Sequence, residues 1–124
     1  MMFDGLKGMA SLAGMMKDLP KMQAKVEQVK NELAGIRVEA ETGGGAVQVV
    51  ATADMKIQSV HIEPALMSSL VDTSSPEDHR MAEELVAGAV NTAMDRARDA
   101  AQQHLAAAAS ELGLPMPPGG LLGS

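Results

Sequence analysis

The fold is decided by residues 36–64, which read IRVEAETGGGAVQVVATADMKIQSVHIEP. Apolar and polar residues alternate from Ile36 to Glu41 and again from Val47, which is the pattern of a strand with one buried face. Three glycines at 43–45 separate the two runs. They predict a tight turn, because glycine adopts positive φ without a steric penalty. The stretch therefore begins with an antiparallel pair of strands.

A third strand is predicted after a second reversal at residues 53–55. Its apolar residues are Ile57, Val60 and Ile62, so the spacing changes from three residues to two. This phase slip indicates a bulge or a late strand start between Ile57 and Val60. Three consecutive short strands with tight turns predict an antiparallel meander.

A heptad pattern of apolar residues precedes the strands. It is formed by Leu12, Met15, Leu19, Met22, Val26, Val29, Leu33 and Ile36. Alternating steps of three and four predict a helix with one apolar seam. Proline removes a backbone donor and clashes with the preceding turn, so we expect the helix to start near Pro20, with Asp18 as its cap. Residues 11–18 are then a kinked or separate turn, and Gly35 ends the helix.

A long helix is predicted after the strands. Residues 64–75 are expected to be a loop with one helical turn at residues 65–67. The sequence Ser75-Pro76-Glu77-Asp78 supplies a cap, a proline at the first helical position and acids in the first turn. Apolar residues then recur at helical spacing as far as Leu112, and Gly113 and Pro115 stop the helix.

These elements make one α+β domain of the order helix, three-stranded antiparallel meander, long helix (α-β-β-β-α). We assign it to residues 15–113, between a flexible N-terminus at residues 1–14 and a disordered Pro/Gly-rich tail at residues 114–124. A helix from Pro76 to Leu112 spans roughly 55 Å, whereas a strand of seven residues spans roughly 23 Å. Because the apolar stripe of the helix outruns the sheet, we predict an obligate homodimer that covers it.

Composition excludes several classes of protein. The chain has no cysteine, which removes disulfides, thiolate metal sites and cysteine nucleophiles and fits a reducing cytoplasm. No run of about 18 apolar residues is present, so a transmembrane helix is excluded. Asp4, Lys7 and several glycines interrupt the N-terminal residues, which is not the pattern of a secretory signal. Few cations and helix-disfavouring glycines also argue against membrane binding by this start.

No catalytic pattern is evident. His61, His79 and His104 share no metal-ligand spacing. The glycines at 43–45 lie between two strands and not between a strand and a helix, so they are not a phosphate-binding loop. No nucleophile has an obvious base. We therefore predict no enzymatic activity, no metal, no cofactor and no small-molecule substrate.

The charges are unevenly distributed along a chain whose net charge is −6. Residues 1–38 contain six of the ten cations and only four acids, whereas residues 39–79 contain one lysine and seven acids. A polyanionic partner would therefore meet the chain on its first helix.

Six cations are candidate nucleic-acid contacts: Lys17, Lys21, Lys25, Lys30, Arg96 and Arg98. The first three recur every four residues off the apolar seam, so they form a cationic stripe on one helix face. The alternative is an ordinary solvated face. The two arginines are adjacent to Asp95 and Asp99, and Asp95 and Arg98 have the spacing of an intrahelical pair. No aromatic side chain is available for base stacking, so any contact would be electrostatic and to the backbone.

Several segments follow one another in an order typical of a known family. They are the Met/Gln/Lys-rich helix beginning at Met15, GGGAVQV at 43–49, VHIEPAL at 60–66, VAGAVNTA at 86–93 with Asn91, and GLPMPPG at 113–119. Over about residues 12–120 the chain resembles the YbaB/EbfC family of bacterial nucleoid-associated proteins. The resemblance implies a cytoplasmic α-β-β-β-α homodimer at the nucleoid, whose helices project like tweezers. It also implies DNA binding with loose sequence preference.

The chain departs from the family pattern in two respects. Residues 68–80 form a longer link into the last helix, and that helix carries few cations. A dimer has twice the net charge of −6, so DNA binding must rely on local stripes against an unfavourable overall field. Only the lysines of the first helix carry over from the resemblance as DNA contacts. The alternative function is a protein-interaction adaptor of the same fold without significant DNA affinity.

Overall fold

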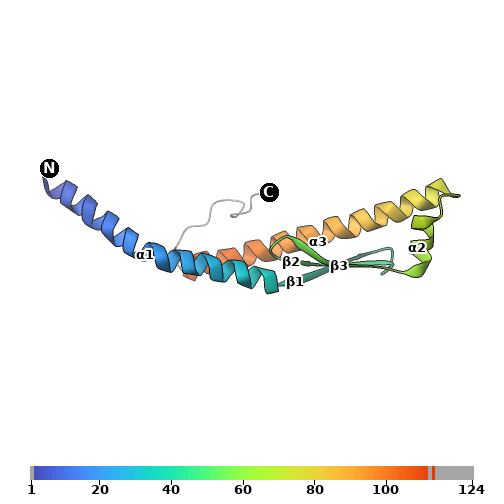
Figure 1. The fold of residues 1–124 in the computed structure, drawn as a ribbon, viewed down its shortest axis with the longest axis horizontal. Coiled ribbons are helices and arrows are strands. Elements are labelled where there is room, and N and C mark those ends of the chain that lie inside the picture. Colours follow the sequence, from blue (N-terminus) through green and yellow to red (C-terminus); the bar gives the residue numbers. More distant parts are fainter. Residues whose placement is uncertain (1, 112, 114–124) are drawn as a thin grey trace.

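The computed structural model describes residues 2–111 and 113, with side chains placed from residue 19 onward. The elements are α1 (Met2–Gly35), β1 (Arg37–Thr42), β2 (Val47–Thr52), β3 (Lys56–Ile62), α2 (Pro64–Val71) and α3 (Pro76–Glu111). Figure 1 shows the two long helices and a small sheet lying along the middle of α3. The predicted order of helix, three strands and helix is confirmed.

The sheet is the predicted meander, with strand order β1-β2-β3 and antiparallel pairing throughout. All three glycines of the first turn have positive φ, between 64° and 97°. The predicted bulge is also present. Val50 pairs with Ser59 while Ala51 pairs with Ile57, so Gln58 is the extra residue on β3. Both features are local, and the sequence pattern was sufficient to predict them.

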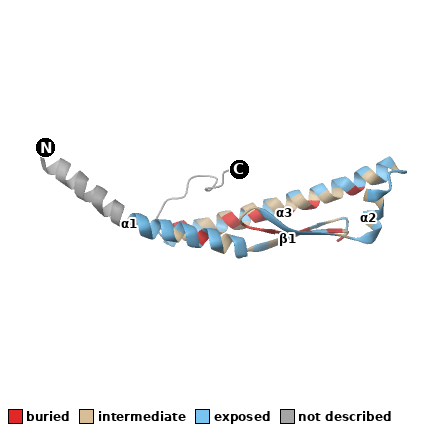
Figure 2. Ribbon diagram, viewed as in Figure 1, coloured by how far each residue is buried: buried red, intermediate tan, exposed pale blue. Residues whose placement is uncertain are grey.

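The core lies between β2 and the middle of α3 (Figure 2). Its fully buried members are Val47, Val49 and Ala51 on β2 and Ala89, Ala93 and Ala97 on α3. Alanines four residues apart present a smooth helix face, which allows the backbone of α3 to pack close to the sheet. Thr42 Oγ1 at the end of β1 donates a hydrogen bond to the carbonyl oxygen of Leu85, at 2.6 Å. The same face of α3 therefore fixes both the sheet and its turn.

The predicted start of the first helix is wrong. Helix α1 begins at Met2 and continues through Pro20 without ending there. A proline inside a helix removes one backbone hydrogen bond but leaves the bonds of the other turns, and Leu19 and Pro20 are exposed. The flexibility of residues 1–14 stays a prediction, and the tail at 114–124 is outside the described residues.

The link before α3 is more ordered than predicted. Residues 64–71 form an eight-residue helix, α2, where a loop with a single helical turn was expected. Leu66 packs against the core cluster, and His79 Nδ1 at the start of α3 lies 3.1 Å from the carbonyl oxygen of Ser69. Tertiary packing therefore extends the short helix.

The overhanging half of α3 is covered in part by the chain itself. Helix α1 lies alongside the C-terminal half of α3 (Figure 1), and Val29, Ala101 and Ala109 are buried. This corrects the argument for a homodimer, because a second copy is not needed to cover this part of the stripe. The apolar surface left open is elsewhere, on α1, β3, α2 and the first turns of α3.

Candidate nucleic-acid interface

The candidate cations lie on the two long helices, four on α1 and two on α3. Lys17 belongs to α1, but its side chain is outside the described ones. Lys21 is exposed and has no ion pair with any side chain within residues 19–111. Among the described side chains of α1, it is therefore the lysine that can meet a phosphate without giving up an ion pair to another described residue.

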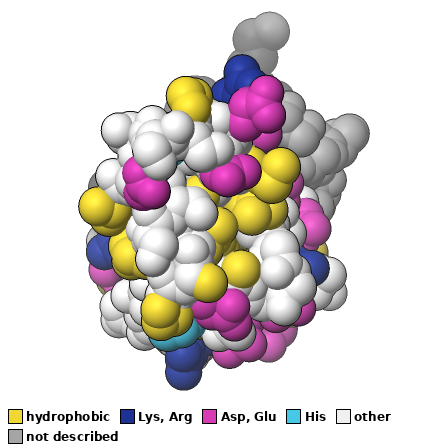
Figure 3. All heavy atoms as spheres, turned by 90° about the vertical axis from the view of Figure 1, so that its right-hand side faces the viewer, with side chains coloured by type: hydrophobic (Ala, Val, Ile, Leu, Met, Phe, Trp, Pro, Cys, Tyr) yellow, Lys and Arg dark blue, Asp and Glu magenta, His cyan; other side chains and the backbone are white. Residues whose placement is uncertain are grey.

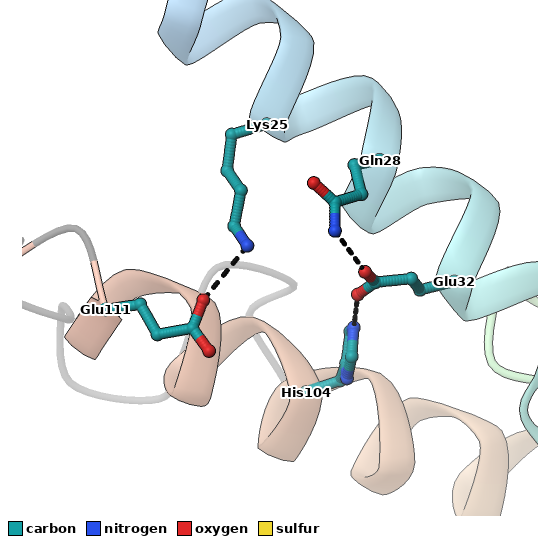
Figure 4. A network of polar contacts seen from close by, with 5 residues as sticks. All are labelled: Lys25, Gln28, Glu32, His104 and Glu111. Carbon is teal, nitrogen blue, oxygen red and sulfur yellow. Dashed lines mark hydrogen bonds and ion pairs between the residues drawn. The ribbon is translucent and has the colours of Figure 1, made fainter.

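Lys25 is not a free cation. Its Nζ atom lies 2.9 Å from Glu111 Oε2 in the last turn of α3, and its side chain is 24% exposed (Figure 4). The hydrogen bond to Glu111 raises the pKa of Lys25 above its usual 10.5. Successive stripe lysines rotate by about 40° around the helix, so the stripe turns toward α3. The ion pair links α1 to the C-terminal end of α3.

Lys30 has a weaker partner. Its Nζ atom is 3.6 Å from Glu27 Oε1 on the same helix, and both side chains are about two-thirds exposed. Exposed pairs of this kind contribute little to stability and are screened by salt. Lys30 can therefore exchange Glu27 for a phosphate.

The two candidate arginines of α3, Arg96 and Arg98, both contact groups of their own chain. Arg96 Nη1 donates a hydrogen bond to the backbone carbonyl oxygen of Glu39. It lines a hollow of about 390 Å³ whose other lining residues include Glu39 and Glu41. Arg98 Nη1 lies 4.0 Å from Asp95 Oδ1, which confirms the predicted intrahelical spacing. Each candidate arginine therefore already has a partner in its own chain.

Sequence reasoning missed the polar network that joins the two helices. Glu32 Oε2 is 2.5 Å from His104 Nε2, and Glu32 Oε1 accepts a hydrogen bond of 2.8 Å from Gln28 Nε2 (Figure 4). The hydrogen bond from His104, and then that from Gln28, lowers the pKa of Glu32 below its ordinary 4.5. The partners are 72 residues apart, so no local spacing could have indicated this contact.

The described residues contain neither a metal-binding cluster nor a helix suited to cross a bilayer. Among them no group of three or more His, Cys, Asp or Glu side chains is arranged to hold a metal ion. His61 is exposed, as expected of a strand residue on the outer face, and His79 contacts Ser69 and Glu83. In the same part of the chain, none of the helices combines the length and apolar character needed to cross a bilayer.

Comparison with known proteins agrees with the resemblance found in the sequence. The model of the YbaB/EbfC DNA-binding family matches residues 9–112. The chain belongs to this family. It is 36% identical over 107 residues to a protein of Nitrobacter hamburgensis named nucleoid-associated protein, covering 86% of this chain and 94% of that one. The YbaB/EbfC family is a DNA-binding family and not a family of enzymes.

A solved structure agrees with the fold of this YbaB/EbfC chain. The crystal structure of an uncharacterised protein from Helicobacter pylori superposes with a TM-score of 0.53 at 18% sequence identity. The match covers 71% of this chain and 93% of the other. At this level of identity the likeness supports the architecture alone.

Proposed function

We propose that this protein binds double-stranded DNA at the nucleoid, as a homodimer, through phosphate contacts with loose sequence preference and without catalysis. The observation that carries the proposal is Lys21, an exposed lysine on α1 with no acidic partner among the described side chains. Lys25 lies one turn away and Lys30 has an exchangeable partner. Phosphate contacts position a protein on DNA but carry no sequence information. Family membership supports DNA as the polyanion.

Strand β3 is the surface that we propose for the dimer. It is an edge strand of the sheet, and six of its seven residues are exposed. Ile57 and Val60 are 39% and 44% exposed. An uncovered edge strand with apolar side chains is a template for pairing with another chain, and twofold pairing would cover it. Such a dimer would also present the α1 lysines twice.

The experiment is a fluorescence anisotropy titration of two DNA duplexes of unrelated sequence at low salt. We expect both duplexes to bind with similar affinity. Lys21→Glu should weaken binding to both by the same factor. Arg37→Glu is the matched control, because it makes the same charge change at an exposed position of β1. Equal losses from the two variants would mean that net charge alone is responsible, and no binding by the parent protein would overturn the proposal.

A further inference from the structure

The end of the molecule formed by α2 and the start of α3 has an exposed apolar surface. We call Met67, Val71 and Met81 the cap; they are 43%, 76% and 60% exposed. Met67 and Val71 lie one turn apart on α2 and line a shallow groove of about 450 Å³ with Pro64, Ser68 and Asp72. Figure 3 looks onto this end and shows hydrophobic side chains gathered among acidic ones.

Acidic residues surround the cap. Between residues 63 and 84 the exposed acids are Glu63, Asp72, Glu77, Asp78, Glu83 and Glu84, and the only Lys or Arg in that range is Arg80. His79 is engaged with Ser69 and Glu83. An apolar centre with a charged rim is the composition of a protein interaction site, and here the rim is predominantly acidic, with six acids against Arg80.

The sign of the rim selects the occupant. DNA and anionic lipid surfaces are repelled by this field. A second cap carries the same acids, so a symmetric cap-to-cap contact would place like charges together. In another copy, the exposed Met22 and Val26 of α1 share a groove with Glu27. The nearby Lys25 and Lys30 are already paired with Glu111 and Glu27 of their own chain, so this segment would bring an acid and mostly paired lysines to the cap. The cap is therefore complementary to a surface of apolar residues that is flanked by unpaired Lys or Arg side chains.

We propose that the cap docks a basic amphipathic helix of a protein partner. The spacing of Met67 and Val71 matches apolar residues one turn apart on such a helix, which is a common way for an amphipathic helix to occupy a groove. Methionine side chains adapt to irregular partner surfaces. The cap lies at the opposite end of the molecule from α1 (Figure 1). The proposal thus goes beyond DNA binding, because the two ligands would occupy separate ends.

The probe is a short, fluorescently labelled synthetic peptide with leucines along one helical face and lysines on the other. The controls are a scrambled peptide of the same composition and a peptide with glutamate in place of lysine. The assay contains the full chain and no DNA, so its outcome is independent of the DNA-binding proposal. We expect saturable binding of the amphipathic basic peptide, at least about tenfold tighter than either control, and weaker binding as salt is raised.

A pair of matched double variants locates the binding. Met67→Ser with Val71→Ser removes one methionine and one valine from the cap, and we expect peptide affinity to fall by at least about tenfold. Met22→Ser with Val26→Ser removes the same two residue types from α1, where they are 41% and 51% exposed, and should leave affinity unchanged. Circular dichroism checks that both variants are folded.

Three outcomes would overturn the proposal. Equal binding of the scrambled peptide would mean that the peptide binds nonspecifically. Equal losses of peptide affinity in both double variants would mean that the cap is not the binding site. Dissociation of a dimer by the cap variant, measured by sedimentation, would assign the cap to the contact between copies instead. Failure of the chain to bind DNA, with peptide binding intact, would contradict the proposed function but not this one.

Discussion

Lys25 Nζ lies 2.9 Å from Glu111 Oε2, so one lysine of the candidate DNA-binding stripe is already neutralised by an acid of the same chain. In the proposed interface a phosphate would have to displace Glu111 before it could bind Lys25. We therefore expect the ion pair to lower DNA affinity, while it joins α1 to the end of α3. This competition sets apart the two neighbouring lysines, because Lys21 has no such partner within residues 19–111.

Removing the acid should release the lysine. We expect Glu111→Gln to increase DNA affinity about two- to tenfold at low salt, because one more cation per chain becomes available to a phosphate. Glu27→Gln, which frees the exposed Lys30 from a longer pair of 3.6 Å, should have a smaller effect. Anisotropy titrations of one duplex compare the variants. An unchanged or reduced affinity for Glu111→Gln, with its helix content intact, would show that Lys25 is not a DNA contact.

The contact between Glu32 and His104 should make stability depend on pH. The pKa of Glu32 is lower in the folded protein than its ordinary 4.5, first because of the hydrogen bond to His104 and then because of that to Gln28. A carboxyl with a lowered folded pKa stabilises the fold above its unfolded pKa, and this stability is lost as pH falls through the folded value. We expect the urea concentration at the unfolding midpoint to decrease as the pH is lowered below about 4.5.

Glu32→Gln is the variant that isolates this group. It should lower the urea midpoint at neutral pH and flatten its decline on acidification, since the titrating carboxyl is gone. Asp72→Asn is a suitable control, because Asp72 also has a lowered pKa, owing to hydrogen bonds from Ser74, but lies at the end of α2 and outside the contact between α1 and α3. If the urea midpoints of the parent and of Glu32→Gln changed in parallel with pH, Glu32 would not be the group that causes the loss of stability in acid.

Substitutions in the turn between β1 and β2 should change the stability of the fold without changing DNA affinity. A valine at Gly43, Gly44 or Gly45 would have to adopt positive φ, at a cost of roughly 1–2 kcal/mol per residue. A side chain at Gly43 would also meet Leu85 Cδ1 at 3.3 Å, whereas Gly44 has nothing within 4 Å. We therefore expect Gly43→Val to lower the melting temperature more than Gly44→Val. DNA affinity of the folded fraction should not change; a loss of affinity at unchanged melting temperature would make the turn a contact loop.

The proposed dimer can be tested at β3. Val60→Lys places a charge on the exposed edge strand, and we expect it to shift the sedimenting species toward the 12.9 kDa chain. Val71→Lys serves as the control, because it introduces the same charge on α2, where the side chain is 76% exposed. The proposed dimer would be contradicted if the parent protein sedimented as a folded monomer at micromolar concentration.

Local patterns were enough to predict the strands and the glycine turn, because each depends on neighbouring residues. The phase slip between Ile57 and Val60 allowed either a bulge or a late strand start, and the structure has the bulge, at Gln58. The start of α1 was missed because a proline was given more weight than the turns on either side of it. The left-handed conformation of Met55, with φ of 68°, has no signal in its residue type. The contacts of Lys25 and Glu32 lie 86 and 72 residues away in sequence. The packing of α1 on α3 was needed to reveal that Lys25 is already paired, whereas the Asp95–Arg98 pair follows from local helical spacing.

The central claim is that the α1 lysines of a dimer bind DNA phosphates, and the most direct test is the salt dependence of that binding. Lys17 and Lys21 occur twice in a dimer, and Lys25 adds two more contacts where a phosphate displaces Glu111. Log K should therefore fall against log salt with a slope of about −0.9 per contact, roughly −4 without Lys25 and roughly −5 with it. Changing all three to Glu should abolish binding, and changing Arg96 and Arg98 should do less, because Arg96 is bound to Glu39 and Arg98 to Asp95. A triple variant that binds as well as the parent, or a slope near zero, would contradict the claim.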